Sequence, residues 1–331
     1  MSDTVLVTGA SGFVGAAVAR AAVARGFKTK VLMRAAANHA NIAGLDVEAV
    51  TGDMRDEASM TRALDGVRYL FHVAADYRLW ARDPMEIARN NLEGARAVMG
   101  AAKTTGVERI VYTSSVAALK PGNGVAVDET SRHTPQSVIG AYKLSKLLAE
   151  REVERRIAEQ GLPCVMVAPS TPIGARDIKP TPTGKMIRDA AAGRVPAYID
   201  TGLNMVHVDD VAEGHALALE KGRVGERYVL GGENLLLKDI LALVADVVGR
   251  RPPRIELPEA VVWPAAWFME GLARLTGIPP MMTRDHIKMA RHKMFFSSAK
   301  AMQELGYAPR PVRRAVEDAV AWFRANGMLR A

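Results

Sequence analysis

The sequence of 331 residues is long enough for one large domain, or for a core with a smaller appended lobe. Apolar residues make up 49% of the chain and charged residues 24%, which is the composition of an ordinary globular protein. The formal net charge of +8 is compatible with an acidic partner, but the Lys and Arg residues are scattered and form no long basic run. We therefore expect no nucleic-acid partner, because a phosphorylated cofactor or substrate needs far fewer cations.

Cys164 is the only cysteine, which excludes an intramolecular disulfide and a cysteine-based metal site, and its apolar surroundings predict a buried thiol. No cluster of acids and histidines has the spacing of metal ligands, so we expect no bound metal. No signal peptide precedes the first predicted strand. The most apolar late segment, residues 261–275, falls short of the roughly 20 apolar residues that cross a bilayer. We expect a cytoplasmic protein without a transmembrane segment, which leaves peripheral contact with a membrane open.

In the first half of the chain, short runs of β-forming residues alternate with helix-length amphipathic runs. We expect strands at residues 5–7, 29–33, 47–50, 69–73, 110–113 and 164–167. We expect helices at residues 13–24, 60–64 and 85–104, and a further helix that ends with residues 147–157. This alternation predicts a Rossmann-type, doubly wound α/β fold, in which helices cover both faces of a parallel sheet.

The pattern changes after Pro169, where several prolines and glycines interrupt regular structure. Residues 206–208 and 227–230 then have the character of strands that return to the core, and the remainder is mainly helical. We predict a Rossmann core at residues 1–168, with returning segments at about 204–235. A smaller, mainly helical substrate-binding lobe would comprise residues 169–203 and 236–331, so that the two lobes interleave in sequence.

A glycine-rich turn, residues 8–15, joins the first predicted strand to the first predicted helix. Gly9, Gly12 and Gly15 have a characteristic spacing. The first glycine allows a tight turn, the second lets the backbone approach a pyrophosphate, and the third allows the helix to pack closely on the strand. The N–H groups and the positive dipole end of the helix would bind phosphates. We therefore expect a dinucleotide site lined by Gly9, Ser11, Gly12, Phe13, Val14 and Gly15.

The residues after the second predicted strand favour NADP over NAD. Enzymes that prefer NAD commonly place a carboxylate there to bind the ribose 2′-hydroxyl, whereas this chain has Met33 and Arg34. The planar guanidinium of Arg34 suits a 2′-phosphate. The competing interpretation is a solvated surface arginine, and NAD remains the alternative cofactor. Asp53 would touch the adenine edge, unless it or Asp56 caps the next helix. Further cofactor contacts are expected after the third and fourth strands, at Asp53, Met54, Ala74 and Ala75.

Tyr142 and Lys146 lie four residues apart in a predicted helix, so their side chains rise from one face. A tyrosine titrates at about 10, and a neighbouring ammonium would lower that pKa and make the phenol useful for proton transfer. Ser114 and Ser115 follow the fifth predicted strand, where a hydroxyl could hold a substrate oxygen beside Tyr142. We predict Ser115, Tyr142 and Lys146 as the catalytic residues.

Taken together, these motifs resemble those of the extended short-chain dehydrogenases/reductases, and the resemblance runs from Val5 to about Gly327. Residues 74–84 and 169–184 resemble the branch of hopanoid-associated sugar epimerases, which is itself similar to the dihydroflavonol reductases. The resemblance implies an NAD(P)-dependent enzyme that moves a hydride at an alcohol or ketone carbon. It adds that Asn91 is structural or part of a proton path, and that Pro169 flanks the nicotinamide.

The same resemblance assigns roles to the predicted catalytic residues. Tyr142 would be the acid/base, and Ser115 would polarise the substrate oxygen. Lys146 would bind the nicotinamide ribose and tune Tyr142. Arg34 matches the arginine that NADP-using reductases carry after the second strand.

Candidate substrate residues follow the fourth strand. Tyr77, Arg78, Trp80 and Arg82 form an aromatic and basic cluster that would line a substrate cleft, and the competing interpretation is a structured surface loop. His207 lies beside Asp209, where we expect a packed and hydrogen-bonded histidine rather than a general base.

Three functions remain open at this point: a sugar-directed epimerase or reductase, an NADPH-dependent reductase of less polar ketones, and a non-catalytic NADP-sensing protein. The intact serine, tyrosine and lysine count against a sensor. Ala168 weakens the first hypothesis, because nucleotide-sugar members often carry an asparagine at this place that can bind substrate phosphate. The expected partner is a small alcohol, ketone or sugar, and a homodimer is compatible with the sequence.

Overall fold

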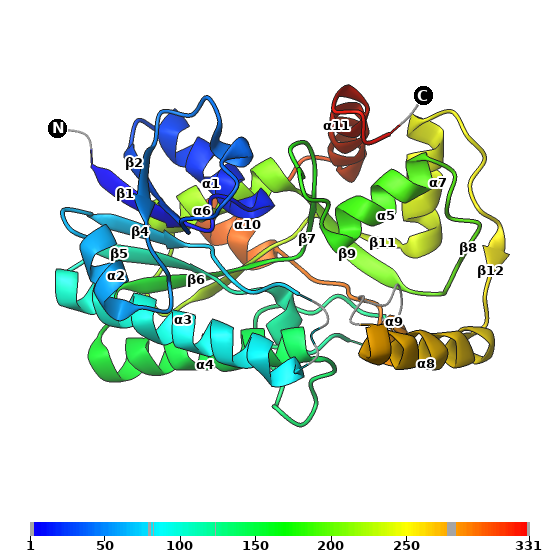
Figure 1. Ribbon diagram of the computed structural model, residues 1–331, viewed down its shortest axis with the longest axis horizontal. Helices are drawn as coiled ribbons and strands as arrows, with labels where there is room; N and C mark the ends of the chain where they lie inside the picture. The colour runs from blue at the N-terminus through cyan, green and yellow to red at the C-terminus, as the bar shows by residue number, and fades with distance from the viewer. Residues whose placement is uncertain (1–2, 79–80, 82, 123, 277–282, 330–331) are drawn as a thin grey trace.

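The computed structural model describes residues 3–78, 81, 83–122, 124–276 and 283–329, and its centre is a parallel sheet (Figure 1). The strands of this sheet are β1 (Thr4–Thr8), β2 (Lys28–Met33), β3 (Glu48–Thr51), β4 (Tyr69–His72), β5 (Arg109–Thr113), β6 (Cys164–Pro169) and β10 (Arg227–Leu230). Their order is β10-β6-β5-β4-β1-β2-β3, and every neighbouring pair is parallel. From β1 the chain therefore adds β2 and β3 toward one edge of the sheet, and from β4 it adds β5, β6 and β10 toward the other edge.

Helices cover both faces of this sheet, as the alternation in the sequence predicts. One face carries α1 (Phe13–Ala24), α6 (Val208–Lys221) and α10 (Ala299–Leu305). The other carries α2 (Glu57–Ala63), α3 (Pro84–Thr105) and α4 (Ala141–Gln160). Figure 1 shows the two layers above and below the strands. The fold is thus a Rossmann-type, doubly wound α/β fold.

Alternation of side chains along the strands explains why both faces are covered. Val5 and Val7 of β1 join the buried cluster under α1 and α6, whereas Leu6 joins the cluster under α2, α3 and α4. The side chains of a strand point alternately to opposite faces, so a run of apolar residues makes both faces apolar. Cys164 is buried in β6, as predicted, and burial raises the pKa of its thiol.

A smaller group of elements lies beside the carboxyl ends of the main sheet. Its strands are β7 (Thr171–Ile173), β9 (Gly202–His207) and β11 (Glu233–Leu236), with the separate pair β8 (Ala197–Tyr198) and β12 (Ile255–Glu256). Its helices are α5 (Pro182–Ala191), α7 (Leu237–Val247), α8 (Glu259–Thr276), α9 (Arg284–Ala290) and α11 (Val312–Ala325). The helices α5, α7 and α11 share a buried apolar cluster that includes Ile187, Ile240 and Phe323. Two short 3-10 helices, η1 (Ala40–Ile42) and η2 (Val116–Ala118), complete the description.

One predicted strand differs from expectation. Residues 227–230 do return to the main sheet as β10, which pairs with β6. Residues 206–208 do not: β9 ends at His207 and pairs with β7 and β11, and Val208 already begins α6. Val206 and Val208 nevertheless pack in the buried cluster of β1 and α1, so the segment returns to the core without joining the main sheet. A short apolar strand carries no sign of which sheet it joins. The division into two lobes at residue 168 stays a prediction.

The arrangement fixes where a ligand can meet the sheet. The order of strands reverses between β1 and β4, and ligands of open α/β sheets bind outside the carboxyl ends of the strands at such a point. In the part of the chain that the structure describes, no helix is long and apolar enough to span a membrane.

Candidate active site

The glycine-rich turn between β1 and α1 is tightly packed. Gly9 has a φ of +78°, a left-handed conformation that glycine adopts without strain. A Cβ atom at Gly9 would lie 2.8 Å from the backbone nitrogen of Ala74, and one at Gly15 would collide with the carbonyl oxygen of Gly9. The turn therefore needs glycine at both positions, because it lies against the end of β4 and α1 lies against the turn.

The start of α1 offers donors to an anion. Gly12 is the N-cap, so no side chain caps the helix, and its first turn contains no acidic residue. The first N–H groups of a helix have no partner within it, and the positive end of the helix dipole adds to their attraction for phosphate. The carbonyl oxygen of Ser11 accepts a hydrogen bond from Asn41 Nδ2 at 2.9 Å, which anchors the turn. The residues present thus fit the pyrophosphate of a dinucleotide.

Charged groups lie at the carboxyl ends of β2 and β3, where the adenosine end of a dinucleotide would lie. Asp53 accepts a hydrogen bond from Arg55 Nη2 at 2.7 Å, and this pairing lowers the pKa of Asp53, as does the nearby charge of Arg34. Arg34 is exposed and makes no hydrogen bond or ion pair through its guanidinium to any described residue. Asp56, not Asp53, caps α2 by accepting from Ala58 N at 3.1 Å.

The end of β4 is tied to β1 by a threonine. The hydroxyl of Thr8 accepts hydrogen bonds from the N–H groups of Val73 and Ala74, both at 3.1 Å, and lies 2.9 Å from Nδ1 of His72. Burial lowers the pKa of His72 to about 3, and the charge of Lys146 acts in the same direction. His72 is therefore a neutral hydrogen-bonding group that holds the edge of the sheet in place.

The remaining predicted cofactor residues lie at the same edge. Ala75 follows β4 and is partly exposed, and Pro169 is the last residue of β6 and is buried. Met54 follows β3 and packs against Gly94 of α3, where an added Cβ would lie 3.1 Å from its Cε. Val14 lies in the first turn of α1 and is partly buried. Their contacts with a cofactor stay predictions.

Ser115, Tyr142 and Lys146 come together between the end of β5 and the start of α4. The hydroxyl of Ser115 accepts from the backbone N–H of Ala117 at 3.1 Å, which orients it at the start of η2, and it hydrogen-bonds with Tyr142. Nζ of Lys146 donates to the carbonyl oxygen of Thr113 at 2.8 Å. The predicted trio is thus one cluster, held by the strand end on one side and by α4 on the other.

Burial dominates the electrostatics of this cluster. It raises the pKa of Tyr142 above the usual 10.0, and the hydrogen bond with Ser115 acts in the opposite direction. Burial also lowers the pKa of Lys146 to about 8, against the charge of Glu150. The expectation that the tyrosine titrates below its usual value is therefore wrong for this structure. Burial destabilises the phenolate by more than the hydrogen bond with Ser115 stabilises it. Tyr142 is protonated at neutral pH and is placed to donate a proton.

Asn91 of α3 clamps the cluster from outside. Its Oδ1 accepts from the backbone N–H of Asp76 at 2.6 Å, and its Nδ2 donates to the carbonyl oxygen of Asp76 at 2.9 Å. The same Nδ2 donates to the hydroxyl of Ser145 at 2.8 Å, and that hydroxyl donates to the carbonyl oxygen of Tyr142 at 2.7 Å. Of the two roles that the sequence leaves open, these contacts favour the structural one.

The sequence analysis did not predict a buried group of charges that lies next to the cluster of Ser115, Tyr142 and Lys146. Ser114 donates to the carboxylate of Glu150, which lies one helical turn after Lys146. Nη2 of Arg227 on β10 lies 2.5 Å from Glu150 and 2.8 Å from Glu154. Burial raises the pKa of Glu150, and Arg227 opposes that shift. The group links β5, β10 and α4 directly behind Ser115.

On the substrate side, Tyr77 follows β4 with 49% of its surface exposed. Burial raises the pKa of Tyr77, and the charge of Asp177 adds to the rise, so the segment after β4 faces the segment between β7 and α5. Asp177 is buried and accepts from Thr181 N and Oγ1, both at 2.8 Å. The other two predicted substrate residues, Trp80 and Arg82, lie outside the described residues.

His207 is a packing histidine, as predicted. Its Nδ1 accepts from the backbone N–H of Asp209 at 3.0 Å, so the side chain caps α6. Its Nε2 lies 3.1 Å from Oδ2 of Asp318 on α11. Both ring nitrogens are therefore engaged between two helices, and neither is available as a base.

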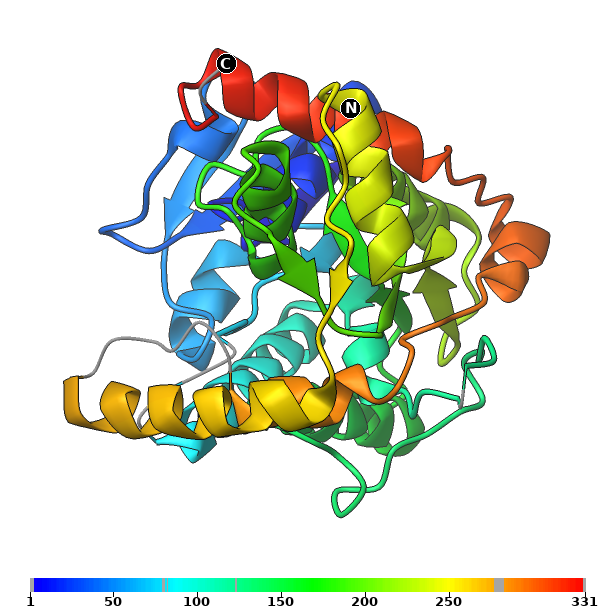
Figure 2. The ribbon, with the colours of Figure 1, turned by 90° about the vertical axis from the view of Figure 1, so that its right-hand side faces the viewer.

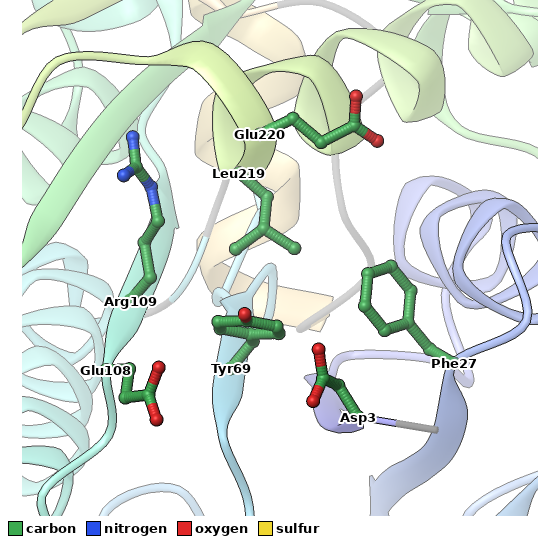
Figure 3. Close-up of a pocket in the computed structure, with 7 residues that line it drawn as sticks. All are labelled: Asp3, Phe27, Tyr69, Glu108, Arg109, Leu219 and Glu220. Carbon is green, nitrogen blue, oxygen red and sulfur yellow. The ribbon is translucent and has the colours of Figure 1, made fainter. Parts of the chain in front are cut away.

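A pocket of about 350 Å³ lies at the opposite edge of the sheet (Figure 3). Asp3, Tyr69 and Arg109, at the amino ends of β1, β4 and β5, line it. The predicted cofactor and catalytic residues belong to the carboxyl ends, so this pocket has no part in the chemistry.

Comparison with known proteins agrees with this geometry. The model of the NAD dependent epimerase/dehydratase family matches residues 5–231. The chain belongs to this family, and it is an NAD(P)-dependent enzyme of the oxidoreductase or epimerase kind.

Similar proteins cover the chain from end to end. A protein from Synechocystis, which carries the provisional name dihydroflavonol 4-reductase, is 40% identical over 335 residues that cover 100% of this chain and 97% of the relative. Sterol demethylase protein B of Methylococcus capsulatus is 34% identical, covering 98% of this chain and 100% of the relative. The crystal structure of gox2253 matches with a TM-score of 0.90 at 54% identity, covering 99% of this chain and 100% of that one.

Proposed function

We propose that this protein is an NADPH-dependent reductase of ketones, with Ser115, Tyr142 and Lys146 as its catalytic residues. The observation that carries the cofactor choice is the exposed Arg34, which follows β2 without a partner among the described residues. A planar guanidinium binds a phosphate with two parallel hydrogen bonds, and a carboxylate for the 2′-hydroxyl of NAD is missing from the four residues that follow the strand.

The residues suggest how a carbonyl would be reduced. A bound nicotinamide supplies the hydride that reaches the carbonyl carbon. Ser115 donates a hydrogen bond to the carbonyl oxygen and holds it beside Tyr142. Tyr142, whose raised pKa keeps it protonated, gives its proton to the same oxygen as negative charge develops there. The ammonium of Lys146, one helical turn after Tyr142 on α4, would stabilise the resulting phenolate and would hold the ribose of the cofactor.

The environment of Ala168 argues for a substrate without a nucleoside diphosphate. Ala168 is fully buried among apolar side chains, which include Val116, Val229 and Phe296. An asparagine amide is missing there, so this position offers no hydrogen bond to a substrate phosphate. The names of the two relatives, a dihydroflavonol 4-reductase and a sterol demethylase protein, are those of enzymes with less polar substrates. The competing hypothesis is the sugar epimerase, which would need a cofactor that returns its hydride within each cycle.

The test follows nicotinamide absorbance with a panel of cyclic ketones and a panel of nucleotide sugars. Stoichiometric consumption of NADPH with a ketone supports the proposal. Conversion of a sugar without net change in absorbance would overturn it in favour of the epimerase.

A single substitution tests the preference for NADPH over NADH. Arg34→Ala should weaken NADPH binding by about 1.5–3 kcal/mol, which is roughly 10–150-fold, and leave NADH binding nearly unchanged. Arg62→Ala, which removes an exposed arginine of α2 outside the turn, is the matched control. An equal loss for both cofactors would contradict the assignment.

A further inference from the structure

Lys143, the residue after Tyr142, has a buried ammonium group without a carboxylate partner. The residue is 8% exposed. Within the part of the chain that the structure describes, the one hydrogen-bond contact of its Nζ is with Sδ of Met294, at 3.4 Å. A thioether sulfur is only a weak acceptor. Burial alone lowers the pKa of Lys143 to about 8. A lysine is almost never buried to this extent unless it is paired, so the ammonium calls for a partner.

Lys146, one helical turn further along α4, shows what Lys143 lacks. The ammonium of Lys146 donates to the carbonyl oxygen of Thr113 at 2.8 Å, and the charge of Glu150 raises its pKa. Among the described residues, no carbonyl oxygen or carboxylate does the same for Lys143. Burial of an unpaired charge costs free energy, and a bound anion would return it.

The charged side chains around Lys143 are basic. His133 is 5% exposed and lies in the loop before α4. The charges of Lys143, Lys120 and His292 lower the pKa of His133, which burial brings to about 4. No carboxylate of the described chain is among the groups that act on this histidine. Its Nε2 is buried without a hydrogen-bond partner. Two buried polar groups, one of them a cation, thus lie together with no anion to match them.

Asp285 of α9 comes near the start of α4 but does not neutralise this cluster. An added Cβ at Gly140 would lie 3.9 Å from its Oδ2. The carboxylate is half exposed, pairs with Lys288 at 3.9 Å, and has no part in the pKa shift of Lys143. The N-terminus of α4 adds further positive potential, because Gly140 supplies no side-chain cap and the first turn contains no acidic residue.

The ammonium lies beside the catalytic cluster. Side chains of a helix lean toward its N-terminus, so Nζ of Lys143 lies along the first turn of α4. Met294 belongs to the segment between α9 and α10, which Figure 2 shows in orange. It packs in a mostly buried apolar cluster with Val116 and Ala168, and Val116 follows Ser115 directly. The ammonium therefore lies at the edge of an apolar cluster that also borders the catalytic serine.

We propose that Lys143 binds an oxyanion, a carboxylate or phosphate group, which the substrate presents beside the catalytic cluster. One ammonium next to apolar side chains suits a ketone with an apolar body and a single acidic group. The assignment of the oxyanion to a substrate rests on the proposed function, whereas the binding of an oxyanion does not. Free inorganic phosphate has the same chemistry, so the experiment separates the two sources.

The first test measures binding of inorganic phosphate without turnover. Sodium phosphate is added to the full chain, whose dinucleotide site is saturated with NADP, and is compared with sodium chloride of equal ionic strength. Thermal unfolding and the line width of the phosphate signal in phosphorus NMR report binding. Lys143→Met keeps the length of the side chain and removes its charge, so phosphate affinity should fall about tenfold or more. Lys143→Arg keeps the charge and should retain most of the affinity.

Controls distinguish a binding lysine from a structural one. Lys103→Met removes an exposed lysine of α3 and should bind phosphate as the wild type does. The ammonium of Lys143 is unpaired when no ligand is bound, so Lys143→Met should unfold in chloride at the wild-type temperature or above it. Unchanged phosphate affinity in Lys143→Met would overturn the proposal, whatever its unfolding temperature.

The second test identifies the source of the oxyanion. Ketones with a free carboxylate are compared with their methyl esters by consumption of NADPH. The wild type should use each acid with a kcat/KM about tenfold higher than that of its ester, and Lys143→Met should lose this preference. Equal use of acids and esters by the wild type would overturn the assignment to the substrate. If no ketone is reduced, the proposed function fails instead, and the phosphate titration alone decides whether Lys143 binds an oxyanion.

Discussion

Replacement of Asn91 by alanine tests how the candidate active site is held together. Asn91→Ala removes the three hydrogen bonds that join α3 to the segment after β4 and to α4. Asn91 is only 5% exposed, so water does not readily replace them. A hydrogen bond contributes about 1 kcal/mol net, so the free energy of unfolding should fall by about 3 kcal/mol. In a chain of this size, the loss corresponds to a drop in Tm of roughly 4 °C.

The neighbouring residue provides the matched control. Asn90 is also on α3, at a less buried place. Its Nδ2 donates to Oδ2 of Asp76 at 3.1 Å, and its Oδ1 accepts from the exposed Arg55 Nη1 at 3.3 Å, so both hydrogen bonds are longer than those of Asn91. Asn90→Ala should cost about 1 kcal/mol or less. Urea denaturation followed by circular dichroism measures both variants. Equal losses of unfolding free energy for the two variants would refute the proposed role of Asn91 in holding the site together. A loss below about 1 kcal/mol for Asn91→Ala would refute it as well.

Three further predictions concern the same site. Tyr142→Phe should lower turnover about 10²–10⁴-fold while cofactor affinity, measured by fluorescence titration, is kept; normal turnover would remove Tyr142 from the chemistry. Lys146 has a pKa of about 8 when folded and 10.5 as a free side chain, so the folded chain binds fewer protons between these values. The stability of the wild type relative to Lys146→Met should therefore rise by about 2 kcal/mol as pH increases from about 8 to about 10, and a flat difference would contradict the burial of the ammonium. Gly15→Ala should destabilise the protein by about 2 kcal/mol or more and abolish cofactor binding, because its methyl group collides with Gly9, whereas Gly271→Ala meets no atom and should do neither.

Local patterns predicted the main sheet well, because its strands obey local rules. The helix expected at residues 13–24 is α1 with the same bounds, and residues 227–230 are β10. The central strands are short apolar runs bounded by turn residues, and both of their faces are buried, so their sequences are typical of a parallel sheet. The edge strand β3 is mostly exposed. The helix expected to carry Tyr142 and Lys146 and to end with residues 147–157 is α4, which begins at Ala141 and continues to Gln160. It follows Gly140, whose φ of +91° sets the start of α4 just before Tyr142.

What depends on the surroundings could not be predicted in the same way. The spacing of Tyr142 and Lys146 shows that they share a helix face, but not that burial would raise the pKa of one and lower that of the other. Likewise, β9 is as apolar as a strand of the main sheet, and only the folded chain shows that its partners are β7 and β11. Burial and pairing are properties of the assembled core, to which distant segments contribute.

The buried charges behind Ser115 show why a site needs more than its reacting groups. Glu150 and Arg227 are 77 residues apart, and each alone would pass for a surface charge of its own element. Their ion pair is a weak source of stability, because removing two charges from water costs about as much as their attraction returns. Its geometric effect is larger. Glu150 holds Ser114 and raises the pKa of Lys146, so the same carboxylate orients the strand end beside Ser115 and keeps the lysine charged. An apolar pair of equal volume would lose both effects.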